Sequence, residues 1–516
     1  MNKDEKITQL EAKINTLEQY IQTLREQLRL ALQQRFGVSS EKAKFENPDQ
    51  LSFFNEAEIS ANFEISEPTL ETITYKRKKQ KGKRELDFAG LPVEQIVHEL
   101  PENEQICGCC GEKLHACGRD VLRRELTVIP QQFKVTEHIQ TAYSCRNCEK
   151  NEISVPMKKS RVPKPVISGS GVVSPSLLAQ IINNKYSLGL PLYRQEQELK
   201  RREIKISRQN MANWIIFSSE KWLSKVYEKI HEEILKNNIL HADETTVQVL
   251  CEDGKSSQSK SYMWLYRTSK CAENQALAFE YQPNRNGENP ENFLKNFKGY
   301  LHSDGYAGYY NLKNIVNVGC WAHLRRKFND AVKTLPNELK NSAPATIGLN
   351  FCSKIFHLDK SFEELDFKER FKQRNLYLKP LSKSFFEWAN SEFSKSKLPN
   401  TLFGKALTFA MNQKEFLMNV FLDGRLELSN NLAENSIRPF VIGRKNWLFC
   451  SSTKGAKASA TVYSVIETAK ANGLKPLAYL KFLFEALPNL QSEDLISNCL
   501  PWSKSLPEQC FMPTVR

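Results

Sequence analysis

Near its beginning the chain repeats apolar residues with a period of seven. Apolar side chains fill the first and fourth positions of this repeat, at Ile7, Ile14, Ile21 and Leu28 and at Leu10, Leu17, Leu24 and Ala31. Isoleucine at the first position with leucine at the fourth favours a parallel two-stranded coiled coil. We therefore expect residues 1–36 to associate with another copy of the chain. The alternative is one amphipathic helix that packs on its own protein.

The regions that follow differ in pattern. Residues 37–94 have no sustained periodicity and end in a basic run from Lys76 to Arg84, which is typical of a flexible linker or of non-specific phosphate contacts. Residues 95–155 contain a cysteine cluster. A stretch rich in Pro, Lys, Ser and Gly then marks a boundary near residues 156–171.

With the remainder of the chain, these regions predict a multidomain α+β protein that contains an α/β core. A helical period covers residues 172–236, short β-rich runs fill residues 239–319, and helical patterns return from residue 322 to about residue 487. A β-rich stretch flanked by helices predicts an α/β core, which we place at residues 237–487. Residues 488–516 form a C-terminal tail.

Charge and composition narrow the classes of protein. The chain has 516 residues and carries 73 Lys and Arg against 59 Asp and Glu, so its formal net charge of +14 favours a polyanionic partner such as nucleic acid. A hydrophobic fraction of 40% excludes a wholly disordered chain. No apolar run is long enough to span a membrane, and the N-terminus lacks the apolar core of a signal peptide. We therefore expect a cytoplasmic protein without membrane contact.

The cysteine cluster predicts a structural zinc site. It contains two Cys-x-x-Cys pairs, Cys107 with Cys110 and Cys145 with Cys148. Two such pairs can close a tetrahedral Zn²⁺ site of four thiolates, and a closed site is structural rather than catalytic. The wide gap between the pairs fits a zinc ribbon-like module with an inserted hairpin. Three further residues lie near enough to replace a ligand: Cys109, His115 and Cys117. The alternative is a set of free buried thiols.

Residues 190–216 have the pattern of a helix-turn-helix. A first helix is expected from Leu192 to about Arg202, and Ser207 is a good N-cap for a second helix. Polar side chains that can contact base edges follow this cap, at Arg208, Gln209, Asn210 and Asn213. The alternative is an ordinary helical hairpin with a polar face.

Three acidic residues are candidates for a catalytic metal site. Asp243 lies within a β-rich run, Asp304 follows another apolar run, and Glu434 lies on an expected short helix that Ser429 or Asn430 could cap. Two strand aspartates and a helix glutamate could hold two Mg²⁺ or Mn²⁺ ions for attack on a phosphodiester. Each acid alone could equally be a turn or cap residue.

Several segments together resemble the insertion sequence 66 family of transposases. The catalytic segments that carry the resemblance are, in order, HADETT, HSDGYAGY, CWAHLRRKF and LSNNLAENSIRPFVIGRKNWLFCSS. Further matches are RFGVSSEK after the heptads, the cysteine pairs in CGCCGEKL and YSCRNC, and CLPW in the tail. The resemblance covers most of the chain.

The resemblance implies an acidic-triad transposase with an RNase H-like catalytic core. Matched by motif, Asp243 and Asp304 are the two aspartates and Glu434 is the glutamate. The long separation between Asp304 and Glu434 implies a helical insertion at about residues 340–420. His323 is expected to be structural rather than catalytic.

Basic residues near these motifs are candidates for DNA contacts. Arg325 and Arg326 suit phosphate groups, although a solvated helix face would look the same. Residues after Glu434 could hold the DNA end, namely Arg438, Arg444, Lys445 and Trp447, the last of which could equally be a core residue.

The implied reaction has two steps at one site. A water activated by Mg²⁺ or Mn²⁺ cuts double-stranded DNA at the element's ends, and the freed 3′-hydroxyl then attacks target DNA. Pairing two ends implies a homo-oligomer, at least a dimer, and small accessory proteins of the same element are plausible partners. The alternatives are a non-catalytic DNA-binding regulator, a nuclease that cuts without joining, and a transposase that has lost its activity.

Overall fold

The computed structural model describes residues 131–144, 157–169, 171–395 and 401–513, with a few single positions before residue 131. It contains two compact units. Residues 71–162 form one unit, whose described part includes the two-residue strands β1 (Ala142–Tyr143) and β2 (Lys158–Lys159), paired antiparallel. Residues 1–70 and 163–516 form the other unit.

Only part of the heptad region is described. Four of its apolar positions lie in helical conformation with exposed side chains, at Ile14, Ile21, Leu24 and Leu28. The coiled coil that we expect there stays a prediction.

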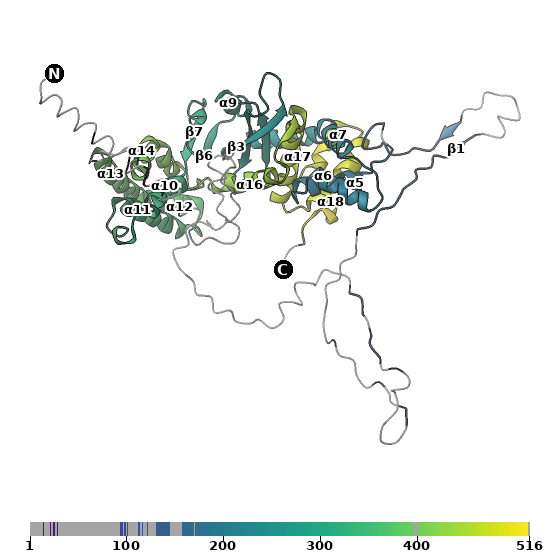
Figure 1. The fold of residues 1–516 in the computed structure, drawn as a ribbon, viewed down its shortest axis with the longest axis horizontal. Helices are drawn as coiled ribbons and strands as arrows, with labels where there is room; N and C mark the ends of the chain where they lie inside the picture. Colours follow the sequence, from purple (N-terminus) through teal and green to yellow (C-terminus); the bar gives the residue numbers. More distant parts are fainter. Residues whose placement is uncertain are drawn as a thin grey trace. The chain divides into compact units, whose positions relative to one another are not determined.

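A mixed sheet forms the centre of the larger unit (Figure 1), with the strand order β5-β4-β3-β6-β7. Its strands are β3 (Ile239–Cys251), β4 (Lys260–Thr268), β5 (Leu277–Gln282), β6 (Gly299–Ser303) and β7 (Ile315–Gly319). Strands β3, β4 and β5 are antiparallel neighbours, whereas β6 and β7 run parallel to β3. The short strand β8 (Cys450–Ser452) pairs with the far end of β3. The α/β core expected from the sequence is therefore confirmed.

One group of helices shares a hydrophobic core with the strands β3, β4 and β5 (Figure 1). It consists of α5 (Pro175–Tyr186), α6 (Leu192–Arg201), α7 (Arg208–Ser218), α8 (Ser224–Lys236), α17 (Thr453–Ala471) and α18 (Pro476–Ala486). Helix α17 covers the edge strand β5: Ser464 Oγ and Thr468 Oγ1 accept hydrogen bonds from the Phe279 and Leu277 amides, at 2.7 and 3.0 Å. These bonds satisfy backbone groups that an edge strand otherwise leaves unpaired.

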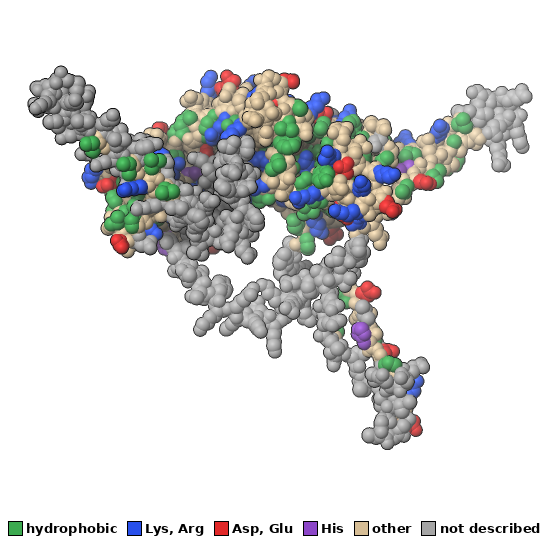
Figure 2. Space-filling model, in the orientation of Figure 1, with side chains coloured by type: hydrophobic (Ala, Val, Ile, Leu, Met, Phe, Trp, Pro, Cys, Tyr) green, Lys and Arg blue, Asp and Glu red, His purple; other side chains and the backbone are tan. Residues whose placement is uncertain are grey.

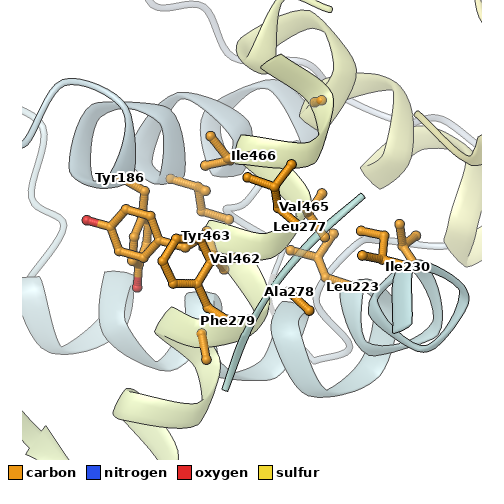
Figure 3. Packing of buried hydrophobic residues seen from close by; sticks show 14 of the residues in the cluster. Tyr186, Leu223, Ile230, Leu277, Ala278, Phe279, Val462, Tyr463, Val465 and Ile466 are labelled. Carbon is orange, nitrogen blue, oxygen red and sulfur yellow. The ribbon is translucent and has the colours of Figure 1, made fainter. Parts of the chain in front are cut away.

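Aromatic and aliphatic side chains fill the contact between α17 and β5 (Figure 3). Tyr463 of α17 lies 5.6 Å from Phe279 of β5 and 5.0 Å from Tyr186 of α5, measured between ring centroids. All three rings are buried. Tyr463 therefore links α5, which precedes the sheet in the sequence, to the strand β5.

A second group of helices has its own hydrophobic cluster beside β7. It consists of α10 (Trp321–Lys333), α11 (Pro344–Lys360), α12 (Phe367–Gln373), α13 (Lys379–Lys395), α14 (Leu402–Asn412) and α15 (Lys414–Met418). Within this group Arg374 is buried and contacts both carboxylate oxygens of Asp359.

Two further helices complete the unit, α9 (Glu288–Phe293) and α16 (Asn431–Trp447). Helix α16 returns the chain from the second helical group to the face of β3. No helix in the described part of the chain is long and apolar enough to cross a membrane.

Candidate active site

The pairing of β3 with β6 brings two aspartates to one level of the sheet. The strands are parallel, and His241 of β3 is the register partner of His302 of β6. The two imidazole rings stack with centroids 4.3 Å apart, so they project from the same face. Asp243 and Asp304 each follow two residues later. Because side chains on a strand alternate between faces, the Asp243 carboxylate is expected on the face that carries His241. Asp304 is the first residue after β6, and its negative charge raises the pKa of Asp243, so the two carboxylates lie near each other.

Helix α16 places Glu434 over this pair. The side chain of Asn430, just before the helix, donates through Nδ2 to the Ala242 carbonyl at 2.8 Å. Its Oδ1 lies 3.1 Å from His241 Nδ1, which must donate because this oxygen can only accept. Glu434 follows Asn430 by one turn of α16, and Asp243 follows His241 by two residues on β3. The contact of Asn430 with His241 therefore brings Glu434 close to Asp243, whose pKa the charge of Glu434 raises.

This helix differs from the one expected. It is 17 residues long rather than short and contains Pro439. Asn430 occupies the N-cap position, but its side chain makes no capping bond and contacts β3 instead. Near the other end, the buried Arg444 donates to Thr246 Oγ1 at 3.2 Å. Two polar contacts therefore hold α16 along β3.

The first two turns of α10 reach the same glutamate. His323 Nδ1 lies 3.6 Å from Glu434 Oε1, and Arg326 Nη2 lies 3.4 Å from Glu434 Oε2. The start of the helix is fixed because the Trp321 amide donates to the Leu428 carbonyl at 2.8 Å. Cys320, the residue before it, accepts a hydrogen bond at Sγ from the Asn430 amide at 3.2 Å.

Three buried polar atoms at this site have no hydrogen-bond partner among the described residues: Asp243 Oδ2, His323 Nδ1 and Glu434 Oε1. An unsatisfied buried polar atom costs about 1–3 kcal/mol. Within the described part of the chain, ligand atoms of Cys320, His323 and Glu434 also lie within 4.8 Å of one another. A thiolate, an imidazole nitrogen and a carboxylate oxygen are all metal ligands, so Cys320, His323 and Glu434 lie close enough together to share a cation.

The electrostatics of the site also favour a cation. Burial raises the pKa of Asp243 well above its usual value, and the negative charges of Asp304, Glu244 and Glu434 raise it further. Burial alone would lower the pKa of His323, but Cys320, Glu434 and Asp304 together raise it to about 9. The acidic groups of the site therefore stabilise a positive charge placed among them, and the protonated His323 ring is one such charge.

A further buried acid, Glu244, lies near Asp304. Glu244 is buried, and its carboxylate accepts hydrogen bonds from Arg285 Nε at 2.9 Å and Tyr309 Oη at 2.8 Å. Burial, followed by the charge of Asp304, raises the pKa of Glu244 to about 7. The Arg285 guanidinium also lies over the Tyr306 ring, 3.9 Å from its centroid.

The basic residues expected to contact DNA have different surroundings. Arg325 is half-buried near Ser353 Oγ, at 3.4 Å, whereas Arg326 faces Glu434. On α16, Arg438 is half-buried, Lys445 is exposed and Arg444 is buried. On the visible face in Figure 2, Lys and Arg side chains are spread out with acidic ones between them. Charge alone therefore does not single out a DNA-binding surface on this face.

The expected second helix of the helix-turn-helix corresponds to α7. Ser207 caps it, because its Oγ accepts from the Asn210 amide at 3.2 Å. Arg208, Gln209 and Asn210 are exposed at its first turn. The polar side chains singled out from the sequence are therefore accessible to a partner.

The predicted zinc ligands Cys107, Cys110, Cys145 and Cys148 lie outside the described residues. So do the possible substitutes Cys109, His115 and Cys117. Their roles stay predictions.

Sequence reasoning gave too little weight to some of the residues now found at the site. His323, which the sequence predicts to be structural, lies with Nδ1 3.6 Å from Glu434 Oε1, and its role stays a prediction. The available signal was the Cys-x-x-His spacing of Cys320 and His323 directly after a β-rich run. No local pattern marked Glu244 and Arg285 as partners, because they lie on separate segments that only the fold brings together.

Four family models match segments of this chain. Residues 170–458, more than half of the chain and including all three acids, match the model described as "Transposase IS66 family". Residues 104–149 match a zinc-finger binding domain of transposase IS66, and residues 464–502 match the IS66 C-terminal element. Residues 23–96 match a model described as "Transposase C of IS166 homeodomain".

Similar full-length proteins occur in Sinorhizobium fredii. The uncharacterized protein y4qI is 28% identical over 96% of this chain and 92% of its own length. The uncharacterized proteins y4hP and y4jD are 27% and 25% identical over 90% and 96% of this chain, and over 85% and 97% of their own lengths. With the family model matched across the sheet and its acidic residues, the chain belongs to the IS66 family of transposases.

Proposed function

We propose that this protein binds the ends of its insertion sequence and catalyses DNA cleavage and strand transfer in an RNase H-like core. The proposal is supported by the register of β3 with β6 and by the charges of Asp304 and Glu434, which raise the pKa of Asp243. The three acids belong to separate elements. Their convergence is costly unless a cation offsets their charge.

In this proposal the three carboxylates hold the divalent cation that the family implies. The cation, Mg²⁺ or Mn²⁺, would activate the attacking oxygen and stabilise the leaving oxygen of a phosphodiester. Asn430 and Arg444 act indirectly, since they hold α16 and hence Glu434 along β3. Arg326 stays beside Glu434 and orients its carboxylate.

The proposed DNA contacts lie on three helices. The exposed first turn of α7 presents Arg208, Gln209 and Asn210, which suit a DNA groove. Lys445 on α16 and Arg325 on α10 would contact phosphates nearer the acids. Because Arg444 is buried against Thr246, we assign it to the protein scaffold.

The proposal also covers parts of the chain outside the described residues. The zinc-finger model spans all four predicted cysteine ligands, which supports a four-thiolate zinc module. The heptads support a homodimer or larger assembly that pairs two element ends. Small accessory proteins of the same element remain plausible partners.

Strand transfer in vitro tests the function. Purified protein is mixed with labelled DNA that carries the element's terminal repeats, with target plasmid and Mg²⁺ or Mn²⁺. The wild type should join ends to target, whereas Asp304→Asn should not, because it loses a metal ligand with little change in volume. Asp253→Asn is the matched control, since Asp253 is exposed in the connection between β3 and β4.

The outcomes separate the alternatives. Joined products from Asp304→Asn would refute the assigned triad. Cleavage without joining by the wild type would favour a nuclease. DNA binding without chemistry in either metal would favour a regulator.

A further inference from the structure

The turn after β6 carries Asp304 and is held by side chains from other segments. We propose that Arg285 is a positioning residue for Asp304, because it fixes Tyr306 and through it the turn that orients the Asp304 carboxylate. The inference rests on the proposed function, since it takes Asp304 as a metal ligand. It deepens that function by naming the residue that positions this ligand.

The Asp304 carboxylate is oriented by its own turn. The Tyr306 amide donates to Asp304 Oδ1 at 3.2 Å. Gly305, between the two, has a φ of 95°, and a Cβ added there would meet Gln413 Oε1 at 2.9 Å, so the turn requires glycine. A carboxylate has two oxygens, so this bond leaves the second one for a cation. The direction of that oxygen therefore depends on where Tyr306 lies.

Arg285 contacts Tyr306 with its side chain and with its backbone. The guanidinium carbon lies 3.9 Å from the centroid of the Tyr306 ring, a cation–π arrangement. The Tyr306 hydroxyl donates to the Arg285 carbonyl. The segment that carries Arg285 is itself anchored, because Asn289 Nδ2 donates to the Asn284 carbonyl at 2.9 Å. Tyr306 therefore cannot shift without breaking two contacts to an anchored residue.

Glu244 holds the Arg285 guanidinium in place. Arg285 donates through both Nε, at 2.9 Å, and Nη2 to Glu244 Oε1. Glu244 is 1% exposed, and its other oxygen accepts from Tyr309 Oη at 2.8 Å. Glu244 directly follows Asp243 on β3. The network thus ties the turn of one proposed metal ligand to the strand of another.

The charge of Arg285 and its shape act in opposite directions on a bound cation. A positive charge near the acids repels a divalent cation, so loss of the charge alone would strengthen metal binding. The planar fork, which the two donors and the stacked ring require, favours metal binding because it orients Asp304. Arg285→Lys keeps the charge and removes the fork, so it isolates the positioning role.

The test measures Mn²⁺ binding by the full-length, zinc-loaded protein, with free Mn²⁺ followed by electron paramagnetic resonance. Mn²⁺ suits oxygen ligands, whereas thiolates select zinc. Arg285→Lys should weaken Mn²⁺ binding about tenfold, the lower end of the loss on removing groups that orient metal ligands. Tyr306→Phe, which loses only the hydroxyl bond to the Arg285 carbonyl, should weaken it less.

Arg425→Lys is the matched control. Arg425 pairs with Asp423 at 2.8 Å, and its side chain is 33% exposed against 38% for Arg285. It contacts Asn238 rather than the turn of Asp304, so its substitution should leave the Mn²⁺ affinity at the wild-type value. Circular dichroism checks that each variant is folded, and Tyr306→Phe decides the question if Arg285→Lys is not.

Asp304→Asn separates this inference from the proposed function. If Arg285 acts through Asp304, Arg285→Lys should cause no further loss of Mn²⁺ affinity in the Asp304→Asn protein. Wild-type affinity in folded Arg285→Lys, or the same loss with and without Asp304, would overturn the inference. The proposed function would then stand as long as Asp304→Asn alone binds Mn²⁺ more weakly. Wild-type affinity in Asp304→Asn would refute both.

Discussion

Asn430→Ala tests whether a polar clamp positions the catalytic helix. Asn430 is 1% exposed and links the start of α16 to β3 through the Ala242 carbonyl and the His241 ring. Alanine removes both bonds and leaves two buried groups, the Ala242 carbonyl and His241 Nδ1, without that partner. At about 1–3 kcal/mol for each of the two unsatisfied buried groups, we expect a loss of roughly 2–6 kcal/mol of unfolding free energy.

Urea unfolding followed by tryptophan fluorescence measures this loss, because Trp264 and Trp321 are buried in the same unit. Asn390→Ala is the control: Asn390 is exposed on α13, where alanine should be neutral or slightly stabilising. Strand transfer by Asn430→Ala should fall more than its folded fraction, since Glu434 loses its anchor. A change in unfolding free energy below about 0.5 kcal/mol, the range of ordinary surface substitutions, would refute the clamp.

Three further substitutions test the charge of Asp243, the buried ion pair of Arg374 with Asp359, and the predicted zinc ligand Cys145. Burial and neighbouring acids raise the folded-state pKa of Asp243 above its unfolded value, so the wild type loses stability as pH rises through that folded pKa. Asp243→Asn cannot ionise, and without added Mg²⁺ or Mn²⁺ its unfolding free energy should exceed the wild type's by a margin that grows with pH. Arg374→Met should cost about 1–3 kcal/mol in urea unfolding, because Asp359 keeps only its 3.4 Å contact with Arg370 and the Leu426 carbonyl loses its donor. Cys145→Ser should lower the zinc content measured by atomic absorption, and unchanged zinc would remove Cys145 from the ligand set.

Local sequence patterns were sufficient to predict the strands, the start of a helix and the candidate acidic residues. The short β-rich runs of residues 239–319 predicted the strands, and Ser207 predicted the start of α7. These features depend on residues close together in the chain, where hydrophobic period and capping act directly. The same holds for the family resemblance, which rests on ordered motifs.

Only the tertiary structure decided which polar groups meet. Asn430 reaches the Ala242 carbonyl across 188 residues of sequence, and His323 reaches Glu434 from another helix. The burial of Arg444 also follows from how α16 docks on β3. Strand register and helix docking are fixed by packing between distant segments, so no local pattern encodes them. The sequence by itself determined which chemistry the chain carries, and the fold determined which of those side chains share one site.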